Sequence, residues 1–209
     1  MGRREEKKQE KRQRLEQSAL QLFDQLGYDR ASIELIASAA DVARGTYYLY
    51  FPDKLALFSA LNDRWYVPMR GLLANTAERV LEVRTADGLM AIWTEMGVGL
   101  ALLSVAYPRE IAIAFREMRR SGEAGDDLRR RETELLDIAV GFTRSAADAG
   151  LIETRDPRLA AYAVYGAGER LYYEMLRGTD LGDPTTGALE VVRLFGRAFG
   201  VRTLEPQSR

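Results

Sequence analysis

Residues 32–54 have the sequence "SIELIASAADVARGTYYLYFPDK", which contains the clearest structural signals in the chain. Ser32 precedes a run of helically spaced apolar residues and is a suitable N-cap, so residues 33–40 are predicted to form a short helix. A second short helix is predicted over residues 43–50, because Pro52 disfavours helical geometry at the residue before it. Two short helices joined by a tight turn make a helix-turn-helix.

The second of these helices has the composition of a surface that contacts nucleic acid. It begins with Arg44, Gly45 and Thr46 and then places four aromatic residues in five positions, residues 47–51. Three of them are tyrosines, whose hydroxyls need hydrogen-bond partners. A helix of eight residues is roughly 12 Å long, comparable with the width of the DNA major groove. We therefore interpret it as a recognition helix.

A long first helix precedes this motif. Residues 3–14 carry seven basic and three acidic side chains, and beyond them apolar residues recur at helical spacing until Gly27, a suitable C-terminal stop. The charged arm has two interpretations, a solvated helix end or a segment attracted to phosphates.

The rest of the chain predicts further helices, about nine in all, and no convincing strand. Asp53 is a suitable cap for the helix that begins near Lys54, and the segment "SGEAGDD", residues 121–127, is predicted to be a loop. Pro68 is predicted to kink or divide the helix that contains it. The fold class is therefore all-α, with predicted later helices over residues 55–83, 86–107, 108–118, 128–149, 157–178 and 187–200.

The composition removes several classes of function. The 209 residues are 46% apolar and 29% charged, so the chain can bury a core, but they include no cysteine and no histidine. Disulfides, Cys/His zinc sites and imidazole bases are excluded. We predict no cofactor and no metal site, and the chain is not expected to be an enzyme. The enzyme alternative would need carboxylates such as Glu169 or Glu174.

The expected location is the cytoplasm. The charged N-terminal segment lacks the apolar core of a secretory signal. Residues 89–106 form the most apolar stretch, but Glu95 interrupts it and flanking Lys or Arg residues are missing. A buried helix is therefore favoured over a membrane span, and no membrane is expected among the partners.

The segment "GYDRASIELIASAADVARGTYYLYFPDKLAL", residues 27–57, resembles the N-terminal signature of the tetracycline-repressor (TetR) family of bacterial transcription regulators. A match of this density over about 30 positions is specific, unlike a lone short motif. The resemblance implies a three-helix DNA-binding domain over residues 1–53 and a larger helical ligand-binding and dimerisation domain over residues 54–209. It implies a homodimeric repressor that binds a pseudo-palindromic double-stranded DNA operator and is released by a small, largely hydrophobic effector.

Four positions depart from the family pattern. Asp41 replaces the turn glycine, Ala43 the usual cap serine and Tyr47 the usual leucine, and Leu49 replaces an aromatic phosphate-contacting residue. Asp tolerates left-handed geometry, so the turn is expected to survive. A third interpretation is an all-helical interaction module that has lost DNA binding through Asp41, Ala43 and Leu49.

The resemblance implies roles in DNA binding for the recognition segment. Arg44 is the candidate for bidentate guanine recognition, and Tyr47 or Tyr48 for contact with a thymine methyl group. Gly45 would allow close approach to the DNA. The candidates for phosphate contacts are Ser32, Thr46, Tyr50 and Lys54. Tyr47 and Phe51 have a second interpretation, as core residues that hold the short helices together.

The later helices supply candidates for effector binding and dimerisation. Large or flexible apolar side chains with one carboxylate suggest a ligand pocket formed by Met90, Trp93, Glu95, Met96, Leu100, Tyr107, Phe115 and Phe142. The alternative is an ordinary core with Glu95 near solvent. By resemblance the last two helices pair between subunits, through Tyr165, Gly168, Tyr172, Val192, Phe195 and Phe199. The alternative is packing within one chain.

Overall fold

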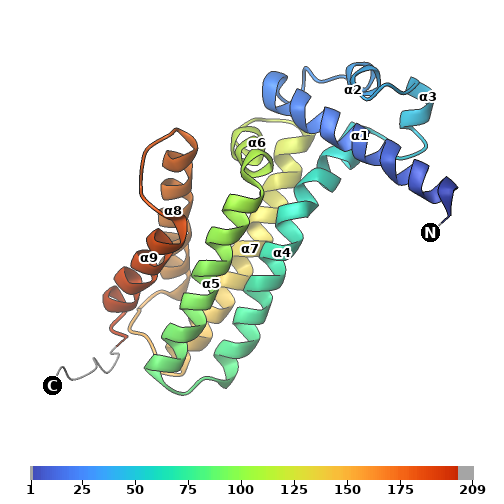
Figure 1. Ribbon diagram of the computed structural model, residues 1–209. Coiled ribbons are helices and arrows are strands. Elements are labelled where there is room, and N and C mark those ends of the chain that lie inside the picture. The colour runs from blue at the N-terminus through green and yellow to red at the C-terminus, as the bar shows by residue number, and fades with distance from the viewer. Residues whose placement is uncertain (1, 202–209) are drawn as a thin grey trace. The chain divides into compact units, whose positions relative to one another are not determined.

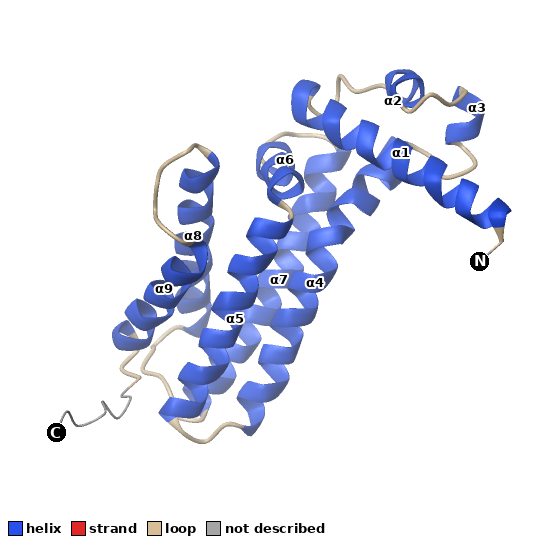
Figure 2. Ribbon diagram, in the orientation of Figure 1, coloured by secondary structure: helices blue, strands red, loops and turns tan. Residues whose placement is uncertain are grey.

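The computed structural model describes residues 2–201, with the side chains of Arg3 and Arg4, part of the predicted arm, outside the described residues. Within 2–201 the chain forms nine α-helices and no strand, as predicted (Figures 1 and 2). The helices are α1 Arg3–Leu26, α2 Ile33–Ala39, α3 Arg44–Tyr47, α4 Lys54–Glu82, α5 Ala86–Ala106, α6 Pro108–Met118, α7 Glu123–Asp148, α8 Pro157–Leu176 and α9 Pro184–Ala198.

The chain divides into two compact units. The first unit consists of Met1–Trp65 and Arg109–Arg130, and the second of Tyr66–Pro108 and Arg131–Arg209. Helices α4 and α7 therefore contribute residues to both units. This is a different division from residues 1–53 and 54–209, which stays a prediction about functional domains.

Local signals in the sequence determine most helix ends. α1 ends before Gly27, which has φ 81°, a conformation that suits glycine. The hydroxyl of Ser32 accepts a hydrogen bond from the Leu35 amide and caps α2. The carboxylate of Asp53 accepts from the Ala56 amide at the start of α4.

Three predicted boundaries are wrong. α3 ends at Tyr47 rather than Tyr50, because the following residues make i→i+3 turn bonds. α7 starts at Glu123, inside the predicted loop. A Cβ on Gly125 would lie 2.3 Å from the backbone oxygen of Arg120, so only glycine fits at this point in the helix. α9 starts at Pro184, because Asp183 caps it.

Pro68 lies inside the continuous α4 helix, so it does not divide the segment.

Aromatic rings form the core of the first unit. The rings of Phe23, Tyr28 and Phe58 lie in mutual contact, with centroid distances of 5.6, 5.5 and 5.0 Å. Phe23 comes from α1 and Phe58 from α4, and all three side chains are buried. Burial of such rings contributes strongly to stability, so this cluster holds the C-terminal end of α1 against α4.

Helix α6 joins this core from a distant part of the sequence. The buried carboxylate of Glu117 accepts a hydrogen bond from the Tyr28 amide at 3.3 Å, and the guanidinium of Arg116 donates to the Asp24 carbonyl at 3.2 Å. The Tyr28 hydroxyl donates to Glu123 at the start of α7. α6 is therefore attached to the C-terminal end of α1 by polar contacts as well as apolar packing.

In the second unit α5 packs closely on α9. A Cβ on Gly97 would lie 2.9 Å from Cγ2 of Val192, and one on Gly196 would lie 2.7 Å from the Met90 sulfur. By length and composition alone α5 is long and apolar enough to cross a membrane, a property that core helices of soluble proteins share. Only 17% of its most apolar window is buried, so the predicted buried helix is buried along part of its surface only.

Candidate nucleic-acid interface

The turn between α2 and α3 is closed by a Schellman motif. The Val42 amide donates to the Ala37 carbonyl at 3.0 Å, and the Asp41 amide donates to the Ser38 carbonyl at 3.1 Å. Asp41 takes the left-handed position of this motif, with φ 53°. The turn therefore forms with aspartate in place of glycine, as expected.

The short α3 helix and the turn that follows it expose one edge to solvent. Arg44, Gly45, Tyr48 and Leu49 are exposed, and the side chain of Leu49 is the most open of these apolar groups at 77%. Apart from Gly45, its chain neighbours and the backbone of its own helix, no heavy atom lies within 4 Å of the position that a Cβ on Gly45 would take. A base edge or sugar could therefore approach the backbone closely here. Figure 1 shows α2 beside α1, with α3 next along the chain.

Arg44 is held by two neighbouring side chains on this surface. Its Nη1 lies 2.9 Å from the Glu34 carboxylate of α2, and its Nη2 lies 3.5 Å from the Tyr48 hydroxyl. The sequence interpretation missed Glu34. From the sequence, a glutamate in the first turn of α2 is expected to interact with the helix dipole. No local spacing indicates that it contacts a residue of another helix.

Tyr47 belongs to the core, which corrects the suggestion that it contacts a thymine methyl group. Its side chain is 0% exposed, and its hydroxyl donates to the Asp53 carbonyl at 2.9 Å. Burial raises the pKa of this phenol well above its usual value. Phe51 is buried as well, so both follow their second interpretation, and Tyr48 is left as the exposed aromatic candidate.

Lys54 has partners within the protein. Its ammonium donates to the Tyr28 carbonyl at 2.8 Å and to the Asp29 carbonyl at 3.4 Å. It also lies 4.2 Å from the centre of the Tyr28 ring. Lys54 therefore ties the start of α4 to the loop after α1, a role that the sequence did not indicate. Its contact with a phosphate stays a prediction, as do those of Ser32, Thr46 and Tyr50, which are half-buried.

The structure separates the predicted ligand residues into two groups. Phe115 belongs to the first unit, and the other seven belong to the second. Trp93 and Phe142 are buried, whereas Met90, Met96, Leu100 and Tyr107 are half-buried. Glu95 is exposed and pairs with Arg79, which lowers the pKa of its carboxyl group. Glu95 thus lies near solvent, as its alternative interpretation has it.

Trp93 has an unusual environment. Its ring is 7% exposed and meets Phe199 edge-on at 6.4 Å, and Phe199 stacks on Phe195. Its indole nitrogen is buried without a hydrogen-bond partner. An unpaired buried donor costs free energy, so this position is a weak point of the second unit.

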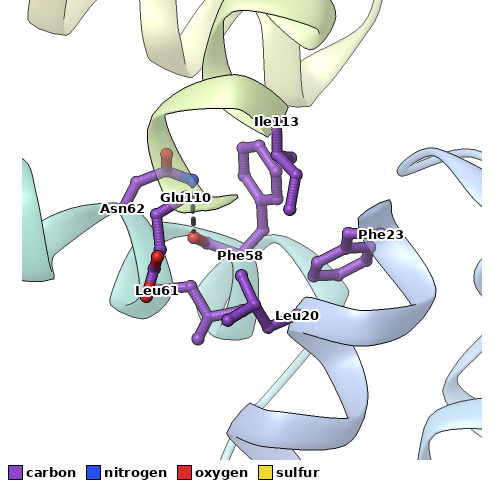
Figure 3. A pocket seen from close by; sticks show the side chains of 7 residues that line it. All are labelled: Leu20, Phe23, Phe58, Leu61, Asn62, Glu110 and Ile113. Atoms are coloured by element: carbon purple, nitrogen blue, oxygen red, sulfur yellow. Dashed lines mark hydrogen bonds between the residues drawn. The ribbon is translucent and has the colours of Figure 1, made fainter. Parts of the chain in front are cut away.

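A small cavity lies elsewhere, in the first unit (Figure 3). It contains one buried carboxylate, Glu110, which pairs with Arg64 at 3.1 Å. The Asn62 side-chain amide donates to the Phe58 carbonyl at 2.9 Å. None of the predicted ligand residues lines this cavity, whose walls are Leu20, Phe23, Phe58, Leu61, Asn62, Glu110 and Ile113.

Several predicted dimerisation residues have contacts within the chain. The Tyr165 hydroxyl donates to Glu132 at 3.2 Å, and the Tyr172 hydroxyl to the Ser104 carbonyl at 3.3 Å. Val192 and Phe199 meet α5, as described above, and Gly168 is exposed with open space around it. Other apolar side chains of α8 and α9 are exposed, namely Leu159, Tyr162, Leu171, Tyr173, Leu176 and Leu194.

Comparison with protein families supports the helix-turn-helix assignment. Residues 17–61 match the model of the bacterial regulatory proteins of the tetR family. The chain is 33% identical over 76 residues to YuxN, an uncharacterized HTH-type transcriptional regulator of Bacillus subtilis. That match covers 36% of this chain and 24% of YuxN, so it spans about a quarter of this relative.

Solved structures show the same fold over nearly the whole chain. SmeT in complex with triclosan superposes with a TM-score of 0.72 at 20% identity, covering 95% of this chain and 99% of SmeT. SmeT is the repressor of the Stenotrophomonas maltophilia multidrug efflux pump SmeDEF. NalD of Pseudomonas aeruginosa, secondary repressor of the MexAB-OprM efflux pump, gives 0.72 at 21% identity, covering 92% and 96%.

Proposed function

We propose that this chain represses transcription by binding a pseudo-palindromic operator through α3. The proposal starts from the match of residues 17–61 to the tetR family and from the fold that the chain shares with SmeT. The observation that carries the proposal is the exposed edge of α3, where Arg44 and Tyr48 flank the open space at Gly45. A helix-turn-helix places such an edge in the major groove, where guanidinium groups distinguish guanine.

Two copies of the chain would bind the operator together. The N-terminal segment that contains the helix-turn-helix has little net positive charge, since residues 1–54 contain ten Lys/Arg and nine Asp/Glu. Arg44 is also paired with Glu34, which reduces its attraction to phosphates. The exposed apolar side chains of α8 and α9, such as Leu159, Leu171 and Leu194, suit burial against a second copy.

We further propose that a small, largely hydrophobic effector releases the DNA. α5 supports this proposal because it is the most apolar helix and yet keeps many side chains half-buried, among them Met96 and Leu100. SmeT, which has this fold, is known in complex with triclosan. α4 and α7 continue from one unit into the other, so a change in their course would affect the residues of both.

In agreement with these roles, we propose that the protein is cytoplasmic and is not an enzyme. Glu174, one of the carboxylates that an enzyme would need, forms ion pairs with Arg170 and Arg177. These pairs at the C-terminal end of α8 are typical of a carboxylate with a structural role.

Selection of bound sequences from a random duplex pool at physiological salt tests the proposal. We expect recovery of a pseudo-palindrome by the full chain and loss of that preference in the Arg44→Ala variant. Sequence-blind binding by the unaltered chain would contradict the operator model and favour the alternative of an interaction module.

A further inference from the structure

The ion pair between Glu34 and Arg44 lies on the surface proposed to meet DNA. Glu34 is the second residue of α2 and Arg44 the first of α3, and their charged atoms are 2.9 Å apart. Both side chains are more than half exposed, at 53% and 62%. The pair therefore does not serve to neutralise buried charge. It connects the two helices of the motif at the surface, beside Gly45 and Tyr48.

The side chain of Glu34 favours its ionised form. Its pKa is lowered, first by the hydrogen bond from its own backbone amide, then by the Ser32 hydroxyl and by Arg44. It is thus negatively charged at neutral pH. A negative charge close to phosphates weakens attraction to every DNA sequence, so Glu34 on a DNA-facing surface would reduce non-specific binding.

The same contact restricts where the guanidinium of Arg44 can go. A free arginine on this surface could donate to any nearby phosphate, a contact that carries no sequence information. Arg44 is tied through Nη1 to Glu34, and its Nη2 lies near the Tyr48 hydroxyl at 3.5 Å. An arginine held in this way loses less conformational freedom when it binds two acceptors of a guanine.

We propose that Glu34 is a positioning residue that gives Arg44 its sequence discrimination. It opposes binding of Arg44 to phosphates and presents the guanidinium to base edges. This inference rests on the proposed function, because it assumes that α3 reads DNA.

The test measures dissociation constants of the full chain for the selected duplex and for a scrambled duplex, by fluorescence anisotropy across a range of salt concentrations. Glu34→Gln is expected to bind the scrambled duplex more tightly and to lower the ratio of the two affinities by about fivefold or more, within what one bidentate contact contributes.

Asp41→Asn is the matched control. It removes one negative charge from a side chain that is 98% exposed in the adjacent turn, and asparagine tolerates the left-handed conformation of that position. Asp41→Asn should strengthen binding to both duplexes alike and leave the ratio unchanged.

A double-mutant cycle separates positioning from any general effect of the substitution. In an Arg44→Ala background, Glu34→Gln should no longer alter the affinity ratio. The inference is overturned if Glu34→Gln leaves the ratio unchanged, if Asp41→Asn lowers it equally, or if the effect persists without Arg44. If the unaltered chain itself does not distinguish the two duplexes, the proposed function fails as well, and the two failures are thereby distinguished.

Discussion

The ammonium of Lys54 lies 2.8 Å from the backbone carbonyl oxygen of Tyr28 and 4.2 Å from the centre of the same residue's ring. These two contacts connect the first residue of α4 to the loop that follows α1, across 26 positions of the chain. Tyr28 in turn bonds to Glu117 of α6 through its amide. The entrance to α4, the end of α1 and α6 thus meet at one residue of the first unit.

Replacing Lys54 by methionine should lower the free energy of unfolding by about 1–2 kcal/mol, because the Tyr28 carbonyl loses a charged donor. Lys11→Met is the matched control, since Lys11 is exposed on α1 and its substitution should be nearly neutral. Denaturant unfolding of both variants measures the difference. Equal effects would show that the contact at Tyr28 contributes nothing.

The left-handed conformation of Asp41 predicts an order of stability at the turn. Asp41→Ala should be destabilising by about 1 kcal/mol, because a Cβ without a polar side chain is disfavoured at φ 53°. Asp41→Gly should be as stable as the unaltered chain or more stable, since glycine adopts this conformation without strain. Thermal unfolding of the two variants checks the order, and a more stable alanine variant would refute it.

The helix ends were largely predictable because caps act within one turn. Ser32, Asp53 and Gly27 act on neighbouring amides or on their own backbone, so their effect is visible in the sequence. The start of α9 was predictable too, from the Asp183–Pro184 signal that the interpretation overlooked. The start of α7 was not predictable, because Gly125 resembles a loop residue until the close approach of the Arg120 and Glu117 carbonyls is known.

The site was predictable in its location and less so in its contacts. The density of the motif indicated which segment forms the helix-turn-helix, but Tyr47 points inward and Lys54 bonds to Tyr28. The partner of Arg44 lies on another helix, ten positions earlier. Such contacts depend on how helices pack against each other, which no local spacing in the sequence determines.

The two buried tryptophans differ in whether the indole nitrogen has a hydrogen-bond partner, so together they test how much such a bond contributes to stability. The Trp65 indole donates to Asn62 at 3.1 Å, whereas the Trp93 indole is buried without a partner. Replacing either by phenylalanine removes the same volume, but only Trp65→Phe leaves a buried acceptor unpaired. Trp65→Phe should therefore be more destabilising than Trp93→Phe, by about 1–2 kcal/mol. Denaturant unfolding measures both, and the reverse order would contradict the assignment.

Buried tyrosines predict a loss of stability at alkaline pH. Burial, with a hydrogen bond to Glu134, raises the pKa of Tyr66 to about 12, and burial also raises the pKa values of Tyr28 and Tyr47. The unfolded chain ionises its tyrosines near pH 10. The folded state thus favours the neutral phenols, so their contribution is complete below about pH 10 and is lost as the pH rises through about 12.

Phenolate absorbance followed against pH checks this expectation. Part of the ten tyrosines should ionise only as the protein unfolds. Tyr66→Phe should weaken the pH dependence of the unfolding free energy above pH 10. Ionisation of all tyrosines in a single step, with the helical structure retained, would contradict the buried environments described here.

A hydroxyl-radical footprint of the full chain on its selected duplex tests most directly whether a dimer reads DNA through α3. Two copies of α3 in successive major grooves should protect two patches on one face of the DNA, with centres about 34–36 Å apart or a multiple of this distance. Arg44→Ala should weaken both patches together. A single protected patch, or uniform protection along the duplex, would contradict a dimer that reads DNA through α3.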